Sequence, residues 1–402
     1  MKGMGGYRAA RSVLLAGLVA AGCSGQGPGT TPTDAGEAPG AGDGSWSPPI
    51  AIPAPPFGLA DDPTAGCASR TARSQADLTG LASLAAGTVV EIAGGPHAAS
   101  NLVLGGTGTA ECPIVVRGPS AAAKAVIQGS ASLVGSYVVF ENLDFDLVTA
   151  AEGISLSGDH LVLRRSDAHG YRPGRNSTVI FAQASTDVVL HDLHVWDNGD
   201  FSYVGEQDVH GVGATTTHRM WIVDSRIHRN RGDAIQLGHQ ADNTLGDFYI
   251  GRNDLYDNGE NSVDIKEASN VVVSQNELHD PPAGYPTVVL HDCPINAAVI
   301  YNTVHDAEVG VNTASLEDNC VDDLPVSIFV LKNSFRTISD TAVQSWGSGK
   351  RYYVTGNAFT SVGTAVDVSP AEPGSILAEG DEGLAAAFAA FTAIYGLDIS
   401  TP

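Results

Sequence analysis

Residues 161–169 read Leu-Val-Leu-Arg-Arg-Ser-Asp-Ala-His, and this short pattern returns along most of the chain. It consists of apolar residues, a polar residue, one more apolar residue and then a histidine or another turn-forming residue. Further copies occupy residues 188–194 and 221–228, and later ones centre on Asn253, Asn276, Asn302, Asn333 and Asn357. The copies lie roughly 23 to 33 residues apart, which is typical of the coils of a solenoid.

Aligning the copies on their polar position reveals two apolar columns. The residue three positions earlier is aliphatic in every copy: Leu163, Val189, Ile222, Ile250, Val273, Val299, Val330 and Val354. The residue two positions later is mostly apolar as well. Equivalent residues of successive parallel strands stack about 4.8 Å apart, so each column predicts an internal ladder of apolar side chains. The β-branched residues in these columns favour strands over helices.

A second strand precedes the first in each coil. Because side chains alternate along a strand, Val263 and Ile265 should point inward, whereas Asp264 and Lys266 should point outward. The outward column that contains Asp264 includes further polar residues: Ser155, Gln236, Asn312, Gln344 and Asp367. The sequence therefore predicts one solenoid face that is lined by polar groups.

Both ends of a solenoid need a cover. We expect a capping helix over residues 74–86 at the N-terminal end and another over 382–395 at the C-terminal end. The second segment has Leu384, Phe388, Phe391 and Ile394 at helical spacing.

The first 22 residues have the features of a lipoprotein signal peptide. A basic start precedes an apolar run over 13–21 that is too short to span a bilayer. Small residues precede Cys23, which would carry the lipid; an ordinary secreted protein with a chance cysteine is the alternative. Residues 23–56 are dense in Gly and Pro and predict a disordered tether. Residues 57–402 then form the solenoid domain of an exported protein, anchored by lipid at the cell surface or outer membrane, or secreted.

Charge narrows the choice of partners. The net charge of −24 makes nucleic-acid binding unexpected. Basic side chains nevertheless gather between residues 210 and 239, which favours an acidic partner at that place. The lipid would be the only contact with a membrane, and we expect a monomer.

Four cysteines lie in the solenoid domain: Cys67, Cys112, Cys293 and Cys320. An even number in an exported protein suggests disulfides. Cys293 and Cys320 follow strands about one repeat apart, so they could face each other across adjacent coils. Cys67 and Cys112 would then join the N-terminal edge. A metal site is less expected because no close C-x-x-C pair occurs.

The glycine-flanked opening with Cys-Pro-Ile-Val-Val-Arg-Gly at residues 112–118, followed by Asn-centred coils, resembles the pectate-lyase-like superfamily. The resemblance covers roughly residues 70 to 380. It implies an all-β, single-stranded, right-handed parallel β-helix of about eight to ten coils. It does not fix the activity, because that superfamily includes lyases, hydrolases, epimerases and noncatalytic surface proteins.

In such folds the substrate usually lies across the outward face of one sheet. The strand Asp264-Ile265-Lys266 would place a lysine beside a carboxylate on that face, as in some calcium-dependent pectate lyases. Lys266 would be the base of a β-elimination, with Asp264 as the carboxylate beside it. Arg231 would neutralise the carboxylate of the substrate. A surface ion pair of little consequence is the alternative.

Further site residues are expected around this strand. Calcium would be held by oxygens of Asp233, Glu260, Glu206 and Asp208, although this cluster is thinner than in the lyases it resembles. His210 would act as a general acid or bind sugar, and His239 and His291 would contact substrate. His169, His228, His279 and His305 share one repeat position and should form a structural column instead. Trp196, Tyr203 and Trp346 are the expected stacking platforms for sugar rings.

Three functions follow from these residues. The first is a polysaccharide lyase that cleaves an acidic, uronate-containing glycan by β-elimination. The second is a glycoside hydrolase that uses paired carboxylates among Asp208, Asp233, Glu260 and Asp264. The third is a noncatalytic surface lipoprotein that binds glycans or partners.

Overall fold

The computed structural model describes residues 63, 65–67, 71–75, 78, 80–203, 207–238, 245–291, 294–313, 326–346, 350–369 and 371–400. The expected signal peptide, Cys23 and the tether lie outside these residues, as do Glu206, His239, Cys293 and Cys320.

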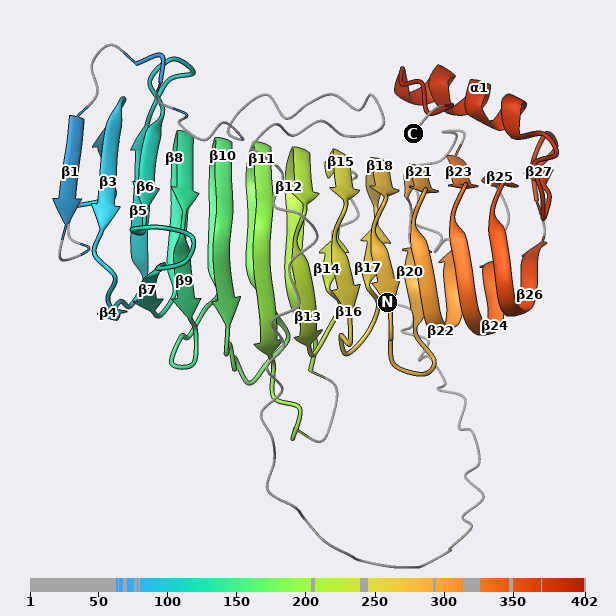
Figure 1. Cartoon of the computed structure of the whole chain (residues 1–402), viewed down its shortest axis with the longest axis horizontal. Helices are drawn as coiled ribbons and strands as arrows, with labels where there is room; N and C mark the ends of the chain where they lie inside the picture. Colours follow the sequence, from blue (N-terminus) through green and yellow to red (C-terminus); the bar gives the residue numbers. More distant parts are fainter. Residues whose placement is uncertain are drawn as a thin grey trace, which may run out of the picture. The chain divides into compact units, whose positions relative to one another are not determined.

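The described residues form a parallel β-solenoid of about ten turns. Successive coils lie side by side in sequence order (Figure 1). Each coil passes through three sheets, here called faces A, B and C, and several long strands bend round a corner from one face to the next.

Face A carries the second strand of the repeat. Its strands are β2 (Leu84–Ala85), β5 (Leu102–Thr107), β14 (Ile235–Leu237), β17 (Val263–Lys266) and β20 (Pro286–His291), the first parts of β8 (Ala131–Glu141), β10 (Ile154–His169), β11 (Ser177–Asn198) and β12 (Val209–Val223), and the last parts of β22 (Thr303–Thr313), β24 (Ser334–Trp346) and β26 (Ala358–Ser369).

Face B follows face A along the chain. Its strands are β1 (Thr71–Gln75), β3 (Thr88–Ile92), β6 (Ile114–Arg117), β15 (Leu245–Gly251), β18 (Ala268–Ser274), β21 (Ile295–Ile300), β23 (Val326–Leu331), β25 (Lys350–Thr355) and β27 (Ile376–Leu377), together with later parts of β8, β10, β11 and β12.

Face C completes the coil. Its own strands are β4 (His97–Ala98), β7 (Ala125–Gln128), β9 (Leu143–Asp146), β13 (Arg226–Asn230), β16 (Asp254–Tyr256) and β19 (Glu277–His279), and the long strands β10, β11, β22, β24 and β26 contribute their remaining ends.

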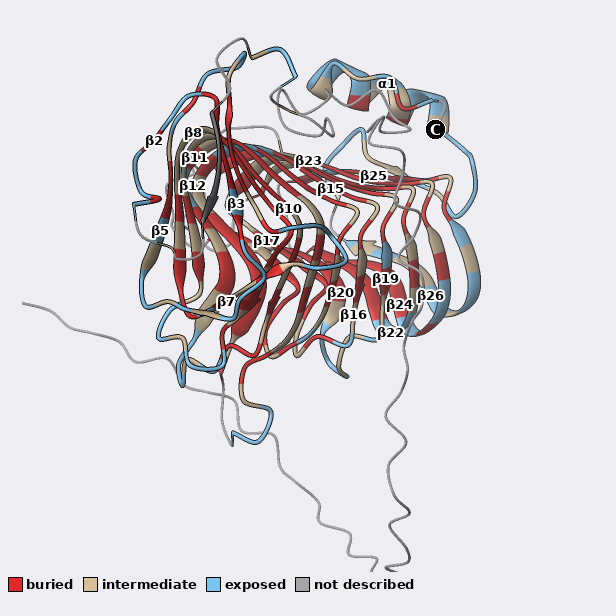
Figure 2. Ribbon diagram, turned by 60° about the vertical axis from the view of Figure 1, so that its left-hand side comes forward, coloured by how far each residue is buried: buried red, intermediate tan, exposed pale blue. Residues whose placement is uncertain are grey.

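The core is the column of apolar side chains enclosed by the three faces (Figure 2). The inward ladder predicted from the sequence is present: Leu163, Ile222, Val273 and Val330 are buried in it. The prediction was wrong for Val189, which packs on the outer side of face B, because Leu190 is the residue in register with Leu163. Register pairs Gln236 with Asp264 and Asn312 with Gln344, as the outward polar column requires. The predicted β-solenoid and its polar face A are confirmed.

A ladder of buried asparagines runs through the turn between faces B and C. The Nδ2 of Asn276 donates to Oδ1 of Asn302 at 2.9 Å, and Asn302 donates in the same way to Asn333 at 3.0 Å. Each Oδ1 also accepts the backbone N–H of the preceding asparagine, and each Nδ2 reaches a carbonyl of an earlier coil. Asn253 and Asn357 continue the ladder at its two ends. A buried turn is tolerated because its polar groups are paired.

Stacked rings cover the outer side of face C. His228, Tyr256, His279 and His305 stack in order, with ring centroids 4.6, 4.9 and 4.6 Å apart. This confirms the structural histidine column. Trp196 belongs to the same stack, because its ring lies 4.5 Å from His169 and 3.9 Å from His194. Its expected role as a sugar platform on face A is therefore not supported.

The N-terminal end differs from the expectation. Within residues 74–86 the described part forms the end of β1 and the short strand β2, not a helix. Leu81 and Leu84 are buried in the core on either side of a bend, so their three-residue spacing reflects two extended segments after a turn at Gly80. Cys67 and Cys112 form a disulfide, which confirms the predicted N-terminal link.

The C-terminal helix is confirmed as α1 (Leu384–Tyr395), but it lies along the outer side of face B and does not cap the last coil as expected. Its buried residues Ala387 and Phe391 pack with Phe329 and Tyr353 on the outer side of face B. The aromatic residues of this outer column are thus structural. No helix in the described part of the chain is long and apolar enough to cross a bilayer.

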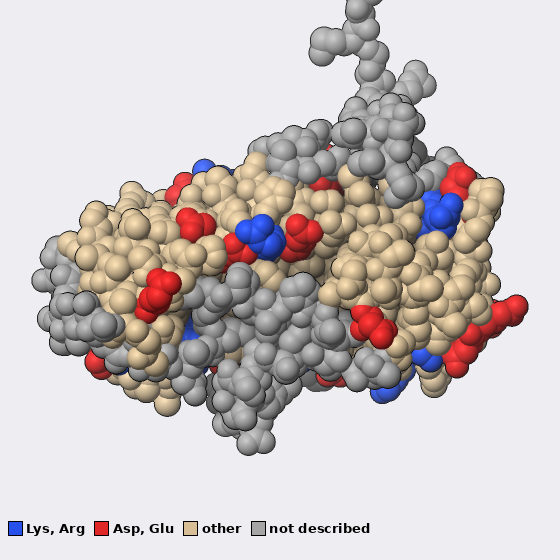
Figure 3. Space-filling view, turned by 90° about the horizontal axis from the view of Figure 1, so that it is seen from above, with Lys and Arg blue, Asp and Glu red and all other residues tan. Residues whose placement is uncertain are grey.

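Basic groups on the side seen in Figure 3 mostly lie near acidic ones, whereas several acidic groups there have no Lys or Arg beside them. Arg219 Nε lies 2.7 Å from Asp187 Oδ1, and Arg252 Nη2 lies 2.6 Å from Asp224 Oδ2.

The ladder gives a stability prediction. Asn302→Leu removes the acceptor for two donors of Asn276 and both side-chain donations of Asn302 to other coils. We expect a loss of about 3 kcal/mol or more in the free energy of unfolding, because buried donors and acceptors lose their partners. Urea unfolding followed by circular dichroism measures it.

Asn312→Leu is the matched control. Asn312 is a buried asparagine of the same coil whose Oδ1 has no hydrogen-bond partner, so its replacement should cost less than about 1 kcal/mol. Equal losses in the two variants would contradict the assigned role of the ladder.

Candidate active site

A groove of about 400 Å³ lies on face A, across β11, β12, β14 and β17. Its described lining consists of Asn176, Ser177, Thr178, Phe181, Gln183, Asp208, His210, Gly213, Ala214, Thr215, Gln236, Gly238 and Lys266. The predicted polar face and the strand lysine Lys266 meet in this groove. Of the described basic side chains between residues 210 and 239, only His210 lines it, whereas Arg219 and Arg226 pair with carboxylates outside it.

A second asparagine ladder fixes the turn between faces C and A beside the groove. Asn198 Nδ2 donates to Asn230 Oδ1 at 2.7 Å, and Asn230 Nδ2 donates to Asn258 Oδ1 at 3.0 Å. All three asparagines are buried. Because each lies at the same point of its coil, Asp233 and Glu260, which follow Asn230 and Asn258, come close together.

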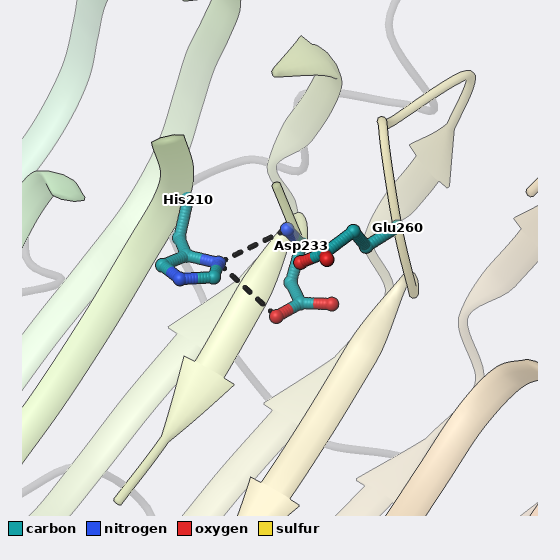
Figure 4. A group of neighbouring side chains, drawn as sticks. All are labelled: His210, Asp233 and Glu260. Atoms are coloured by element: carbon teal, nitrogen blue, oxygen red, sulfur yellow. Dashed lines mark hydrogen bonds and ion pairs between the residues drawn. The ribbon is translucent and has the colours of Figure 1, made fainter. Parts of the chain in front are cut away.

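His210 and Asp233 form a buried pair at the start of face A (Figure 4). His210 Nδ1 lies 3.1 Å from Asp233 Oδ2 and also 3.1 Å from the Asp233 backbone nitrogen. Asp233 Oδ1 accepts the backbone N–H of Asn261 at 2.9 Å. These contacts fix the orientation of the imidazole ring.

The environment changes the pKa of both partners. Burial raises the pKa of Asp233, and the hydrogen bond with His210 offsets this only in part. Burial lowers the pKa of His210, but the hydrogen bond with Asp233 and nearby negative charges outweigh burial, so its net pKa is raised. A histidine held in this way can accept and return a proton during a reaction.

Glu260 completes a cluster with this pair. Ligand atoms of His210, Asp233 and Glu260 all lie within 4.8 Å of one another. Burial, followed by the charges of Asp233 and Asp208, raises the pKa of Glu260 to about 8. Its carboxyl group is therefore mainly protonated at neutral pH.

The cluster does not fit the calcium ion expected from the sequence. Calcium takes six to eight oxygen ligands, and nitrogen is a poor ligand for it. One of the three groups here is an imidazole. Asp233 is occupied by hydrogen bonds, since Oδ1 accepts from Asn261 and Oδ2 from the Gln236 amide at 3.2 Å. Asp208 Oδ2 accepts from the Asn176 amide at 3.1 Å, and Glu206 lies outside the described residues. We therefore do not assign a calcium ion to this cluster.

A second cluster surrounds Asp264 at the other end of the groove. Lys266 Nζ lies 3.1 Å from Asp264 Oδ2, and His291 Nε2 lies 2.8 Å from Oδ1. Burial alone would raise the pKa of Asp264, but the hydrogen bond with His291 and the charge of Lys266 lower it overall. Asp264 is therefore a buried carboxylate that holds Lys266, as the Asp-x-Lys strand predicted, and also contacts His291.

Arg231 is directed away from the role expected of it. Its Nη1 donates to the Asp200 carbonyl at 2.8 Å, and its Nη2 donates to the Tyr203 carbonyl at 2.9 Å. Its guanidinium also lies 5.9 Å from the centre of the Tyr203 ring. These contacts hold the insertion before β12, and Arg231 does not line the groove described above.

The expected sugar platforms are divided among different places. Tyr203 is 49% exposed on the insertion beside Arg231, which keeps it available to a ligand. Trp196 lies on face C, as described above. Trp346 ends β24 on face A, and the structure describes only its backbone.

Sequence reasoning missed two residues of the groove. Gln236 Nε2 lies 3.2 Å from Asp233 Oδ2 and 3.4 Å from Asp264 Oδ2, so it links the two clusters. Phe181 occupies the position of Ser155 in the next coil. Reading the outward column coil by coil would have found both, because Phe181 interrupts a series of small and polar residues.

Arg231→Ala tests the anchoring role. Loss of two hydrogen bonds should free residues 199–203 and speed proteolytic cleavage there at least several-fold, with little change in global unfolding. Arg229→Ala is the matched control, because Arg229 lies two residues away and pairs with Asp197 instead. Equal cleavage of both variants, measured by limited proteolysis and mass spectrometry, would contradict the assignment.

Comparison with known proteins supports the architecture. Neither a protein-family model nor a curated protein sequence matches this chain. Alginate lyase from Paenibacillus sp. str. FPU-7 is similar with a TM-score of 0.53 and 15% identity, over 74% of this chain and 98% of that one.

Two further structures are similar. The A-module of mannuronan C-5 epimerase AlgE6 from Azotobacter vinelandii has a TM-score of 0.51 and 16% identity, over 78% of this chain and 88% of that one. Pectate lyase Pel9A has a TM-score of 0.51 and 14% identity, over 78% of this chain and 81% of that one. The chain therefore has the pectate-lyase-like parallel β-helix fold, as the sequence predicted.

Proposed function

We propose that this protein is an exported polysaccharide lyase that cleaves a uronate-containing glycan by β-elimination in the groove on face A. One observation carries the proposal: a single groove is lined by Lys266, held by a buried carboxylate, and by His210, held by another. The similar alginate and pectate lyases act on acidic polysaccharides of this kind, which supports the proposed substrate class.

The reaction needs a positive charge and a base on one bound sugar. The charge neutralises the uronate carboxylate and makes the neighbouring C5 proton more acidic. The base removes that proton, the C4–O bond breaks and a C4–C5 double bond forms. The leaving oxygen then takes up a proton, which the protonated base can return.

We propose a different division of these two roles from the one expected from the sequence. Lys266 is paired with Asp264, and a neighbouring carboxylate favours the charged form of a lysine. Lys266 is then suited to neutralise the substrate carboxylate, replacing Arg231 in that role. His210, oriented by Asp233, becomes the base.

The groove favours a lyase over the alternatives. Hydrolysis by paired carboxylates needs two of them at the substrate, and the described lining of the groove contains one, Asp208. A noncatalytic binding surface would not need a buried Asp–His pair at its centre.

Activity is tested by ultraviolet absorbance of unsaturated uronides on pectate, alginate and glycosaminoglycans. We expect His210→Ala and Lys266→Ala to lose at least about 100-fold, the usual size of a general-base or charge contribution. Lys266→Arg should keep part of the activity, because arginine supplies the charge. A chelator should leave the rate unchanged. Full activity in Lys266→Ala, or no product on the whole panel, would contradict the proposal.

The pH profile separates the two assignments. If His210 is the base, kcat/KM falls as the pH drops through its raised pKa, because the base becomes protonated. Asp233→Asn removes a charge that raises this pKa, so the acid limb should move to lower pH. An unchanged limb in Asp233→Asn, together with an inactive Lys266→Arg, would return the role of base to Lys266.

Epimerisation is the second candidate, since the similar AlgE6 module belongs to an epimerase. It shares the removal of the C5 proton but returns a proton to the opposite face without breaking the chain. Proton NMR of the treated polymer distinguishes an inverted C5 centre from a new double bond.

Export and anchoring form a separate part of the proposal. The signal peptide and Cys23 predict that the full chain is found with the membrane fraction. Cys23→Ser should release the protein into the soluble exported fraction, because an acyl chain can then no longer be attached. Fractionation followed by immunoblotting measures this, and a variant that stays on the membrane would contradict lipid anchoring.

A further inference from the structure

A second pocket extends the groove along face A. It has a volume of about 420 Å³ and lies over earlier coils, where β5, β8, β10 and β11 pair. It shares Ser177, Thr178 and Phe181 with the groove that holds His210 and Lys266. The two pockets therefore form one continuous surface on which consecutive sugars of a chain can lie.

The two pockets differ in charge. The described lining of the second pocket contains no Lys, Arg or His; its residues are Asn101, Ser130, Ala131, Ser132, Glu152, Gly153, Ile154, Ser155, Ser177, Thr178 and Phe181. Glu152 is its one charged residue, and Arg175 Nη2 balances that charge at 2.7 Å from both carboxylate oxygens. Ser155 and Ser132 hydroxyls lie 3.0 Å apart and face this pocket.

Phe181 stands at the boundary. Its neighbours in the outward column are Ser155 on one side and Gly213 on the other. Both are small, so the ring has no bulky neighbour in its own column. Phe181 lies one coil before that of His210 and three residues further along its strand, since Thr178 is in register with His210 and Phe181 with Gly213. An aromatic ring in this position suits the apolar face of a sugar that adjoins the reacting one.

We propose that this second pocket binds an uncharged sugar next to the reacting uronate, so that the substrate is a glycan in which uronates alternate with neutral sugars. The inference rests on the proposed function. Among the described lining residues a uronate in the second pocket would meet no cation, and the nearby Arg175 is already paired with Glu152, whereas a neutral sugar finds hydroxyl partners and an aromatic face. A polymer made only of uronates would place an uncompensated carboxylate there.

Binding is measured by calorimetry on His210→Ala, which removes the proposed base but keeps the charge of Lys266 that holds the reacting uronate. The probes are alternating hexasaccharides of hyaluronan and of unsulfated chondroitin, compared with all-uronate hexamers of alginate and pectate. We expect at least one alternating hexamer to bind tenfold or more tightly than both all-uronate hexamers. Phe181→Ala should weaken that binding about tenfold, the size expected for one lost stacking contact.

Two variants sharpen the test. Phe201→Ala is the matched control, because Phe201 is 53% exposed on the insertion and lines neither pocket. This variant should bind the alternating hexamer with unchanged affinity. Ser155→Lys places a cation in the second pocket and should improve binding of the all-uronate hexamers several-fold.

Equal or tighter binding of an all-uronate hexamer, or no change in Phe181→Ala, overturns the inference. Selective binding without unsaturated product from the wild-type protein would overturn the lyase proposal and leave the subsite standing.

Discussion

Stacked buried amides are the interaction on which the rest of the structure depends. A parallel solenoid must turn sharply three times per coil, and each turn brings backbone donors and acceptors into an apolar interior. The Asn253–Asn357 ladder supplies each turn between faces B and C with one acceptor and two donors per coil. Because every asparagine bonds to the next coil, the ladder also fixes the register between coils.

The same device positions the candidate site. The shorter ladder through Asn198, Asn230 and Asn258 fixes the turn that leads onto face A. Residues that follow these asparagines by two or three positions then occupy nearly the same place on neighbouring coils. This is why Asp233 and Glu260 meet beside His210, although 27 residues separate them in sequence.

The pairing of two buried carboxylates determines the charges that the groove presents to a substrate. Burying Asp233 and Asp264 is unfavourable unless each is paired. Asp264 holds Lys266 and His291 and stays ionised, whereas Asp233 has only a histidine and amide groups, and its pKa is raised. Two carboxylates on neighbouring coils therefore differ in their affinity for protons. The first supports a fixed positive charge, and the second supports a histidine that can exchange a proton.

The repeat and the spacing of residues in the sequence were enough to predict the solenoid, its apolar columns and the polar face. These features depend on register and on alternation along strands, which the repeat fixes locally. The Cys67–Cys112 disulfide could also be predicted from the sequence. The sequence also placed Asp264 and Lys266 on one face, because residues two apart on a strand must share a side. The directions of side chains in and near the turns could not be predicted in this way. Arg231 contacts the insertion before β12, Trp196 joins the ring stack on face C, and His210 pairs with Asp233. Turns have no such alternation, so these directions depend on contacts with neighbouring coils. For the same reason the apolar spacing at residues 74–86 fitted a helix in sequence, although pairing with β3 and β5 made its ends strands.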